Sequence, residues 1–162
     1  MNPCNCGFFG VAGKNCQCSS HQIHKYISKI SGPLLDRIDI HLDVPMLPPN
    51  DLLSNKTAES SQEIKARTTK ARDIQKERLK STSIFCNAQM SHRQIKHYCS
   101  ITPESKELLS SAIKELGLSA RAYDKILKVA RTIADVEGQE EIRPEHIAEA
   151  IQYRSLDRHW WG

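Results

Sequence analysis

Four cysteines with paired spacing lie near the start of the chain, as Cys4-x-Cys6 and Cys16-x-Cys18. Two chelating thiolate pairs joined by a short loop can satisfy a tetrahedral Zn²⁺ ion, and such sites can contribute folding energy outright. The intervening loop contains three glycines, which allow a tight reversal of the backbone. The pattern therefore predicts a structural metal site with Cys4, Cys6, Cys16 and Cys18 as ligands.

Two other states of these cysteines stay open at the level of sequence. The usual zinc-ribbon spacing is C-x₂-C, so C-x-C is a less standard arrangement. Disulfides would suit a secreted protein, and the thiols could also simply be reduced. If a metal is bound, thiolates select a softer ion than Mg²⁺, which prefers oxygen ligands. Cys86 and Cys99 lie outside the cluster and are expected to be small core or surface residues.

The composition suits a soluble globular protein of one domain, or one domain with a small appendage. Hydrophobic residues make up 39% of the 162 residues, charged residues 26%, and the net charge is +4. No apolar stretch is long enough for a membrane span, and no signal-peptide pattern is present. These features favour a reducing, cytoplasmic setting. The mildly basic charge permits nucleic-acid contact without requiring it.

The first part of the chain predicts a short helix and a strand. Ser19 and Ser20 can cap a helix that runs to about Lys29, and a Ser-Gly-Pro sequence then breaks it. Residues 38–44 alternate strictly between apolar and polar types, which indicates a half-buried strand. Several prolines end this strand and begin a linker over residues 46–60.

A long polar helix is predicted over residues 60–80, capped by Ser60 or Ser61. Its apolar stripe is thin, and its cations outnumber its acids. A solvated face is the simpler interpretation, and a surface for nucleic acid or a neighbouring protomer is the alternative. The cations are Lys65, Arg67, Lys70, Arg72, Lys76, Arg78 and Lys80.

The remainder predicts a compact antiparallel helical bundle over residues 91–158. Ser91, Thr102 and Ser119 are the expected helix caps, and Gly117 and Gly138 the expected stops. Proline at the first helical position marks the starts of two of these helices. Apolar residues recur at helical spacing, so the helices can pack on one another. Trp160 and Trp161, beyond the last helix, are expected to dock on the bundle.

Several long motifs, in order, closely resemble the Mg-chelatase-like AAA+ ATPases of the bacterial ComM/YifB type. The resemblance is weak only in residues 46–85, and Asn5 departs from the proline usual between the first two cysteines. The motifs are MNPCNCG (1–7), SSHQIHKYISKISGPLLDRIDIHLDVP (19–45), LSARAYDKILKVARTIADVEG (118–138) and HIAEAIQYRSLDR (146–158).

The resemblance implies a mainly α fold: an AAA+ C-terminal helical lid bundle, preceded by a cysteine-rich loop and a leftover strand of the AAA+ core. Residues 1–45 would end the core, residues 46–60 would form the linker, and residues 61–158 would form the helical region. No phosphate-loop motif is present. Because that motif precedes the matching region in the family, the chain is expected to be a C-terminal fragment of a longer ATPase.

The resemblance also assigns roles to three polar residues. Asn2 matches the position that senses the γ-phosphate, Arg37 matches the arginine finger, and Arg121 matches a second nucleotide sensor in the lid. A cation such as Arg121 in a helix's first turn opposes the macrodipole unless an anion is bound there. The longer ATPase would bind ATP with Mg²⁺, form hexamers and move DNA as a helicase, whereas this chain alone would be inactive.

Two rival functions remain open. One is a zinc-stabilised helical module that binds nucleic acid, through the helix at 60–80 and the cysteine loop, with no role for ATP. The other is the ATPase subunit of the porphyrin-metallating magnesium chelatase, which shares the AAA+ plan. The cysteine loop favours the ComM type over that subunit.

Overall fold

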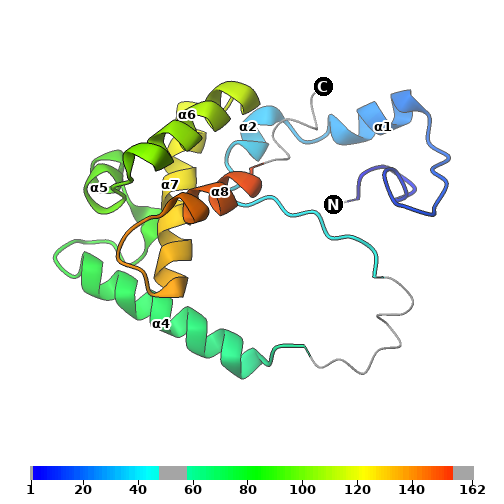
Figure 1. The fold of residues 1–162 in the computed structure, drawn as a ribbon. Helices are drawn as coiled ribbons and strands as arrows, with labels where there is room; N and C mark the ends of the chain where they lie inside the picture. Colours follow the sequence, from blue (N-terminus) through cyan, green and yellow to red (C-terminus); the bar gives the residue numbers. More distant parts are fainter. Residues whose placement is uncertain (1, 48–57, 155–162) are drawn as a thin grey trace. The chain divides into compact units, whose positions relative to one another are not determined.

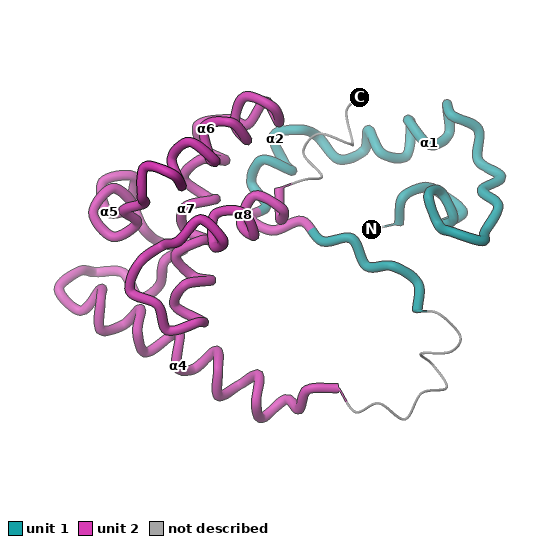
Figure 2. The backbone as a smooth tube through the Cα atoms, viewed as in Figure 1, with its two compact units in different colours: residues 1–38, 42–56 teal, residues 39–41, 57–162 magenta. Residues whose placement is uncertain are grey.

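The computed structural model describes residues 2–47 and 58–154, which fall into two compact units. Unit 1 comprises residues 1–38 and 42–56, and unit 2 comprises residues 39–41 and 57–162 (Figure 2). Every regular element in the described ranges is a helix (Figure 1), which confirms the mainly α fold expected from the sequence. Trp160 and Trp161 lie outside the described residues.

Unit 1 contains the cysteine loop followed by two helices, α1 (Ser20–Ile27) and α2 (Gly32–Leu35). Ser19 caps α1 as predicted. Its hydroxyl accepts a hydrogen bond from the Gln22 amide at 3.3 Å, and the Gln22 side chain accepts from the Ser19 amide at 2.9 Å. This reciprocal capping box satisfies two of the amides that a helix start leaves without partners.

The strand predicted over residues 38–44 is wrong, because these residues form no regular element and no sheet in the described chain. A strand needs a neighbour for its backbone hydrogen bonds, and alternation alone does not supply one. Residues 39–41 instead lie on unit 2, where the His41 amide donates to the Tyr153 carbonyl at 2.8 Å and Asp39 pairs with Lys125 at 2.7 Å. The apolar side chains expected on the strand's buried face are exposed: Ile38, Ile40, Leu42 and Val44.

Unit 2 is a helical bundle whose helices begin at the predicted caps. Ser60, Ser91, Thr102 and Ser119 each accept a hydrogen bond from an amide of the following first turn. Gly117 and Gly138 end two helices in the left-handed conformation, with φ of 61° and 73°. The elements are α4 (Ser61–Leu79), the 3₁₀ turn η1 (Asn87–Gln89), α5 (His92–Tyr98), α6 (Pro103–Leu116), α7 (Ala120–Glu137) and α8 (Pro144–Gln152).

Helix α7 is the centre of the bundle and packs against α4, η1, α5 and α8, while α6 packs against α8 (Figure 1). Ile126 and Ala130 of α7 and Ile147 of α8 are completely buried in the shared core. A single parallel bridge pairs Ile101, just before α6, with Ile142, just before α8. The starts of these two helices are therefore held side by side.

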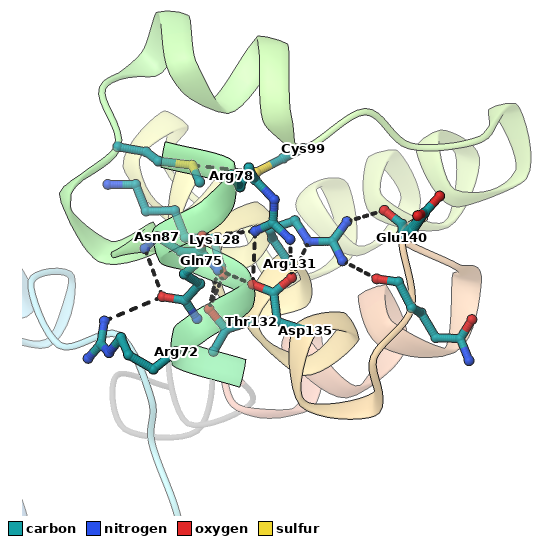
Figure 3. Close-up of polar contacts among 12 residues, drawn as sticks. Arg72, Gln75, Arg78, Asn87, Cys99, Lys128, Arg131, Thr132, Asp135 and Glu140 are labelled. Carbon is teal, nitrogen blue, oxygen red and sulfur yellow. Dashed lines mark hydrogen bonds and ion pairs between the residues drawn. The ribbon is translucent and has the colours of Figure 1, made fainter. Parts of the chain in front are cut away.

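A buried polar network joins α4 and η1 to the inner face of α7 (Figure 3). Its centre is the Asp135 carboxylate, which has no solvent exposure. Arg78 donates to both oxygens of this carboxylate, Arg131 donates through Nε at 3.1 Å, and the Asn87 amide donates at 2.8 Å. Two guanidinium groups and an amide thus satisfy the buried charge, as burial of an ion requires.

Arg131 also fastens the turn that follows α7. Its Nη1 donates to the Glu140 carbonyl at 2.6 Å, and its Nη2 donates to the Gln139 carbonyl at 2.5 Å. Burial of the guanidinium lowers the pKa of Arg131, while the adjacent Asp135 carboxylate opposes this effect. The side chain therefore links the bundle core to the turn between α7 and α8.

No helix in the described ranges has the combination of length and hydropathy that crossing a bilayer requires.

Candidate metal centre and arginine positions

The cysteine loop folds as a series of tight turns that bring all four thiols together. The Gly7 amide donates to the Cys4 carbonyl at 3.1 Å, and the Val11 amide donates to the Phe8 carbonyl at 3.2 Å. Gly7, Gly10 and Gly13 have φ between 73° and 80°, a region that favours glycine. The three loop glycines thus have the positive φ angles that allow the tight backbone reversal predicted from the sequence.

The four sulfurs form one compact cluster. The Sγ of Cys4 lies 3.3 Å from that of Cys6 and 3.7 Å from that of Cys16, and the Cys6 and Cys16 sulfurs are 3.5 Å apart. All four ligand atoms, including Cys18, lie within 4.8 Å of one another. Zn–S bonds of about 2.3 Å in a tetrahedron separate the sulfurs by roughly 3.8 Å, so this arrangement fits a tetrathiolate metal site.

Backbone amides surround the sulfurs and favour their charged form. Burial and the Cys6 side chain raise the pKa of Cys4, but the nearby amides of Phe9 and Gly7, together with Cys16, bring it below its ordinary value, and the Phe8 amide lowers the pKa of Cys6. Partners of this kind orient the ligands of a metal and stabilise the charge on them. The chemistry of the donor set therefore also suits a thiophilic cation.

Without a cation the four thiols cannot all ionise, and their pKa values separate. The Phe8 amide, followed by the hydrogen bond with Cys4, lowers the pKa of Cys6 to about 6. For Cys16, the Cys18 amide favours the thiolate. Burial and the hydrogen bonds with Cys6 and Cys4 outweigh this effect and raise the pKa of Cys16 to about 12. In the metal-free cluster, Cys6 therefore ionises first, and Cys16 stays protonated.

Asn2 lies beside this loop. It is exposed, and its amide nitrogen is 3.6 Å from the position that a Cβ atom on Gly7 would take. The candidate phosphate sensor and the cysteine cluster are therefore neighbours within unit 1.

Arg37 lies on the turn that follows α2, and its side chain is exposed. Its amide donates to the Leu34 carbonyl at 3.0 Å, which fixes the turn. The local alternative was an ion pair with Asp36 or Asp39. Among the described residues Arg37 has no salt bridge with either, and Asp39 pairs instead with Lys125.

Arg121 occupies the first turn of α7 in unit 2 and is exposed. Ser119 accepts a hydrogen bond from the Ala122 amide at 3.2 Å, and the first turn contains no acidic residue. The helix start thus places a guanidinium beside the positive end of the macrodipole, an arrangement that favours a bound anion.

The sequence analysis missed the buried polar network. It counted Arg78 among the cations of a solvated helix face, whereas its side chain is only 16% exposed and pairs with Asp135. The spacing of Arg131 and Asp135, one helical turn apart on the inner face of α7, was the available signal. Arg78 comes from a distant part of the chain, so spacing could not identify it.

Two family models match most of the chain. The model described as magnesium chelatase, subunit ChlI, matches residues 1–52, and the one described as magnesium chelatase, subunit ChlI C-terminal, matches residues 58–154. These matches agree with the family that the sequence motifs resemble.

Curated relatives give the same result. The chain is 38% identical over 159 residues to the competence protein ComM of Haemophilus influenzae, and 38% identical over 160 residues to the uncharacterised protein YifB of Escherichia coli. It is 28% identical over 153 residues to an uncharacterised protein of Mycobacterium tuberculosis. These alignments cover 98%, 98% and 94% of the chain, but only 30% of each relative.

Proposed function

Because the chain belongs to the magnesium chelatase subunit ChlI family, we propose that it is the C-terminal part of an ATP-driven AAA+ ring ATPase of the ComM type. The identity with a competence protein supports DNA as the substrate that the ring moves. In this proposal the longer polypeptide supplies the phosphate loop, binds ATP with Mg²⁺ and forms hexamers. The present chain supplies residues that act on the nucleotide and hydrolyses no ATP alone.

The exposed Arg37 carries this proposal. It follows a short helix on a turn fixed by backbone hydrogen bonds, and the neighbouring Asp39 is engaged by Lys125. A guanidinium presented to solvent in this way can reach the phosphates bound by an adjacent protomer. There it would stabilise the charge that develops during phosphoryl transfer, an effect of about 10³–10⁵ in rate.

Asn2 and Arg121 have complementary roles in the proposal. Asn2 orients the attacking water near the γ-phosphate. Arg121, with the amides of the first turn of α7, binds phosphate from the lid side. The absence of an acid from that turn supports this assignment.

The cysteine cluster holds Zn²⁺ as a structural ion in this proposal. The close spacing of the four sulfurs, together with nearby amides that lower the pKa of Cys4 and Cys6, supports a tetrathiolate site. A bound ion would fix the loop from Cys4 to Cys18, beside which Asn2 lies. This feature also favours a ComM-type role over that of the porphyrin-metallating subunit.

The test is Arg37→Ala in the longer ATPase. ATP turnover should fall by about 10³-fold or more while nucleotide affinity stays close to wild type, because a finger acts mainly on the transition state. Arg93→Ala is the matched control: Arg93 is also exposed and has no ion pair among the described residues, and its loss should leave turnover unchanged.

Mixing experiments test action between protomers. Combining the Arg37→Ala protein with a phosphate-loop mutant should restore part of the turnover, because some interfaces then contain both intact elements. Wild-type turnover in Arg37→Ala would refute the assignment. Arg121→Ala should weaken nucleotide binding as well as turnover, which distinguishes the lid role from that of the finger.

A further inference from the structure

Two phenylalanines are displayed on the surface of the cysteine loop. Phe8 is 39% exposed and Phe9 is 47% exposed. The Phe8 carbonyl accepts from the Val11 amide at 3.2 Å, and the preceding Gly7 amide donates to the Cys4 carbonyl at 3.1 Å, so the main chain at this pair is held by the turns of the cysteine loop. Adjacent aromatic side chains held open to solvent on an anchored loop indicate a binding surface.

The formally charged side chains near these aromatics in sequence are all lysines, although four thiolates around a bound Zn²⁺ would leave the metal cluster itself with a charge of about −2. Residues 1–35 contain three lysines and no acidic residue, so this segment carries three of the four net positive charges of the chain. Lys14 lies with its Nζ 5.9 Å from the centroid of the Phe8 ring, and Lys29 lies 5.5 Å from that of Tyr26. Two of the three lysines therefore lie over an aromatic ring, and the partner that fits is an anion with flat apolar groups.

Helix α4 is a weaker candidate for the surface that binds such an anion, although it contains more cations than the cysteine loop. Arg78 is held by Asp135 in the core. Arg67 pairs with Glu59, Lys76 pairs with Asp73 at 3.2 Å, and Lys80 pairs with Glu77. Much of its positive charge is thus balanced locally, whereas that of the cysteine loop has no acid nearby in sequence.

We propose that the cysteine loop binds single-stranded nucleic acid, with bases stacked on Phe8 and Phe9 and the phosphate backbone contacted by Lys14. Stacking on aromatic rings beside a basic groove is how proteins hold single strands without sequence preference. A duplex hides the faces of its bases, so the loop selects unpaired strands. The inference rests on the proposed function for its class of partner and names the surface that contacts it.

The experiment uses the zinc-loaded 162-residue chain and a fluorescein-labelled (dT)₂₀ probe, with binding followed by anisotropy at several salt concentrations. The double variant F8L/F9L keeps apolar bulk but removes the aromatic faces. Its affinity should fall roughly 30-fold or more, because each of the two lost base–aromatic stacks is worth about 5- to 150-fold. K14A should reduce the slope of log affinity against log salt by about 0.7.

Matched controls separate this surface from general effects. F85L changes a phenylalanine of unit 2 that is 71% exposed, and K65A changes an exposed lysine of α4; both should bind the probe as wild type does. Zinc content measured on every variant tests whether the cysteine loop stays intact. An F8W variant, which keeps an aromatic face, should retain wild-type affinity.

Three results would overturn the inference: wild-type affinity in F8L/F9L with zinc retained, tighter binding of a 20-base-pair duplex than of (dT)₂₀, or no binding of (dT)₂₀ by the wild-type chain. If F8L/F9L loses zinc, the F8W variant with intact zinc becomes the deciding measurement. Weakened binding of (dT)₂₀ by F8W would then refute stacking. The role of Arg37 in ATP turnover is measured separately, so the proposed function can stand when this inference fails.

Discussion

Arg78 of α4 and Asp135 of α7 lie 57 positions apart in the sequence and form a two-pronged ion pair within the bundle (Figure 3). The carboxylate is fully buried, and the arginine side chain is 16% exposed. A planar guanidinium matches both carboxylate oxygens at once, which a lysine could not do. This pair fastens α4 to the helix at the centre of unit 2.

Loss of the Asp135 carboxylate should destabilise unit 2 strongly. Asp135→Ala leaves Arg78 and Arg131 as buried cations without their shared anion, and the expected cost is about 3–5 kcal/mol in the free energy of unfolding. Arg78→Met should cost less, about 1–3 kcal/mol, because Arg131 and Asn87 still serve the carboxylate. Urea unfolding measures both effects.

Lys80→Ala is the control for this prediction. Lys80 forms an exposed ion pair with Glu77, and its removal should change the unfolding free energy by about 0.5 kcal/mol or less. A similar cost for all three variants would contradict a special role for the buried pair.

His146 should stabilise the start of α8 through both ring nitrogens. Nδ1 accepts from the Arg143 amide at 3.0 Å, so the Nε2 proton is the one available to Glu137, also at 3.0 Å. His146→Ala should cost about 1–3 kcal/mol, because the buried ring is lost and the Arg143 amide loses its acceptor. His146→Gln should recover part of this cost, since glutamine at this position can accept the same hydrogen bond.

Thermal unfolding of the His146 variants is best compared with that of Gln152→Ala. Gln152 is exposed on the same helix, and its replacement should leave the midpoint nearly unchanged. Equal stability of His146→Ala and wild type would show that the two hydrogen bonds contribute nothing measurable.

Metal analysis should find about one Zn²⁺ per chain after purification without chelators. Cys16→Ser should reduce the zinc content sharply, whereas Cys86→Ser, outside the cluster, should not. Removing the metal should speed amide exchange in residues 2–18 and leave the α7 core slow, because the cluster and the bundle belong to different units. Substoichiometric zinc together with four reactive thiols would defeat the assignment.

The thiols of the metal-free chain should react in a fixed order. With a pKa of about 6, Cys6 is mainly thiolate at neutral pH, so its alkylation rate should level off above about pH 7. Burial raises the pKa of Cys99 to about 11, so its rate should be low at neutral pH and still be rising at about pH 11. Peptide mapping after brief iodoacetamide treatment measures this order, and equal modification of the two thiols would contradict it.

The helices of this protein could be predicted from sequence because their signals are local. Ser60, Ser91, Thr102 and Ser119 lie within three residues of the amides that they cap, and Gly117 follows the last turn that it ends. The cysteine cluster could also be predicted from the sequence, because its four cysteines and the loop glycines lie close together in the chain.

Features that depend on distant residues could not be predicted in this way. The alternation of residues 38–44 indicated a strand, but a strand also needs a partner that no local pattern specifies. Arg78 resembled the other cations of its helix, and only the fold brings Asp135 to it. The roles of Asn2, Arg37 and Arg121 rest on family resemblance, because none has a local signal strong enough alone.

The hydrogen bonds from Arg131 to the turn between α7 and α8 limit how far the length of that turn can vary in evolution. Both guanidinium ends hold carbonyls of consecutive residues, Gln139 and Glu140, and the same turn leads into the bridge between Ile142 and Ile101. An inserted or deleted residue would pull at least one carbonyl out of reach and shift the start of α8. Related chains that keep this arginine should therefore keep the length of the turn, and gaps in their alignments should fall in other connections.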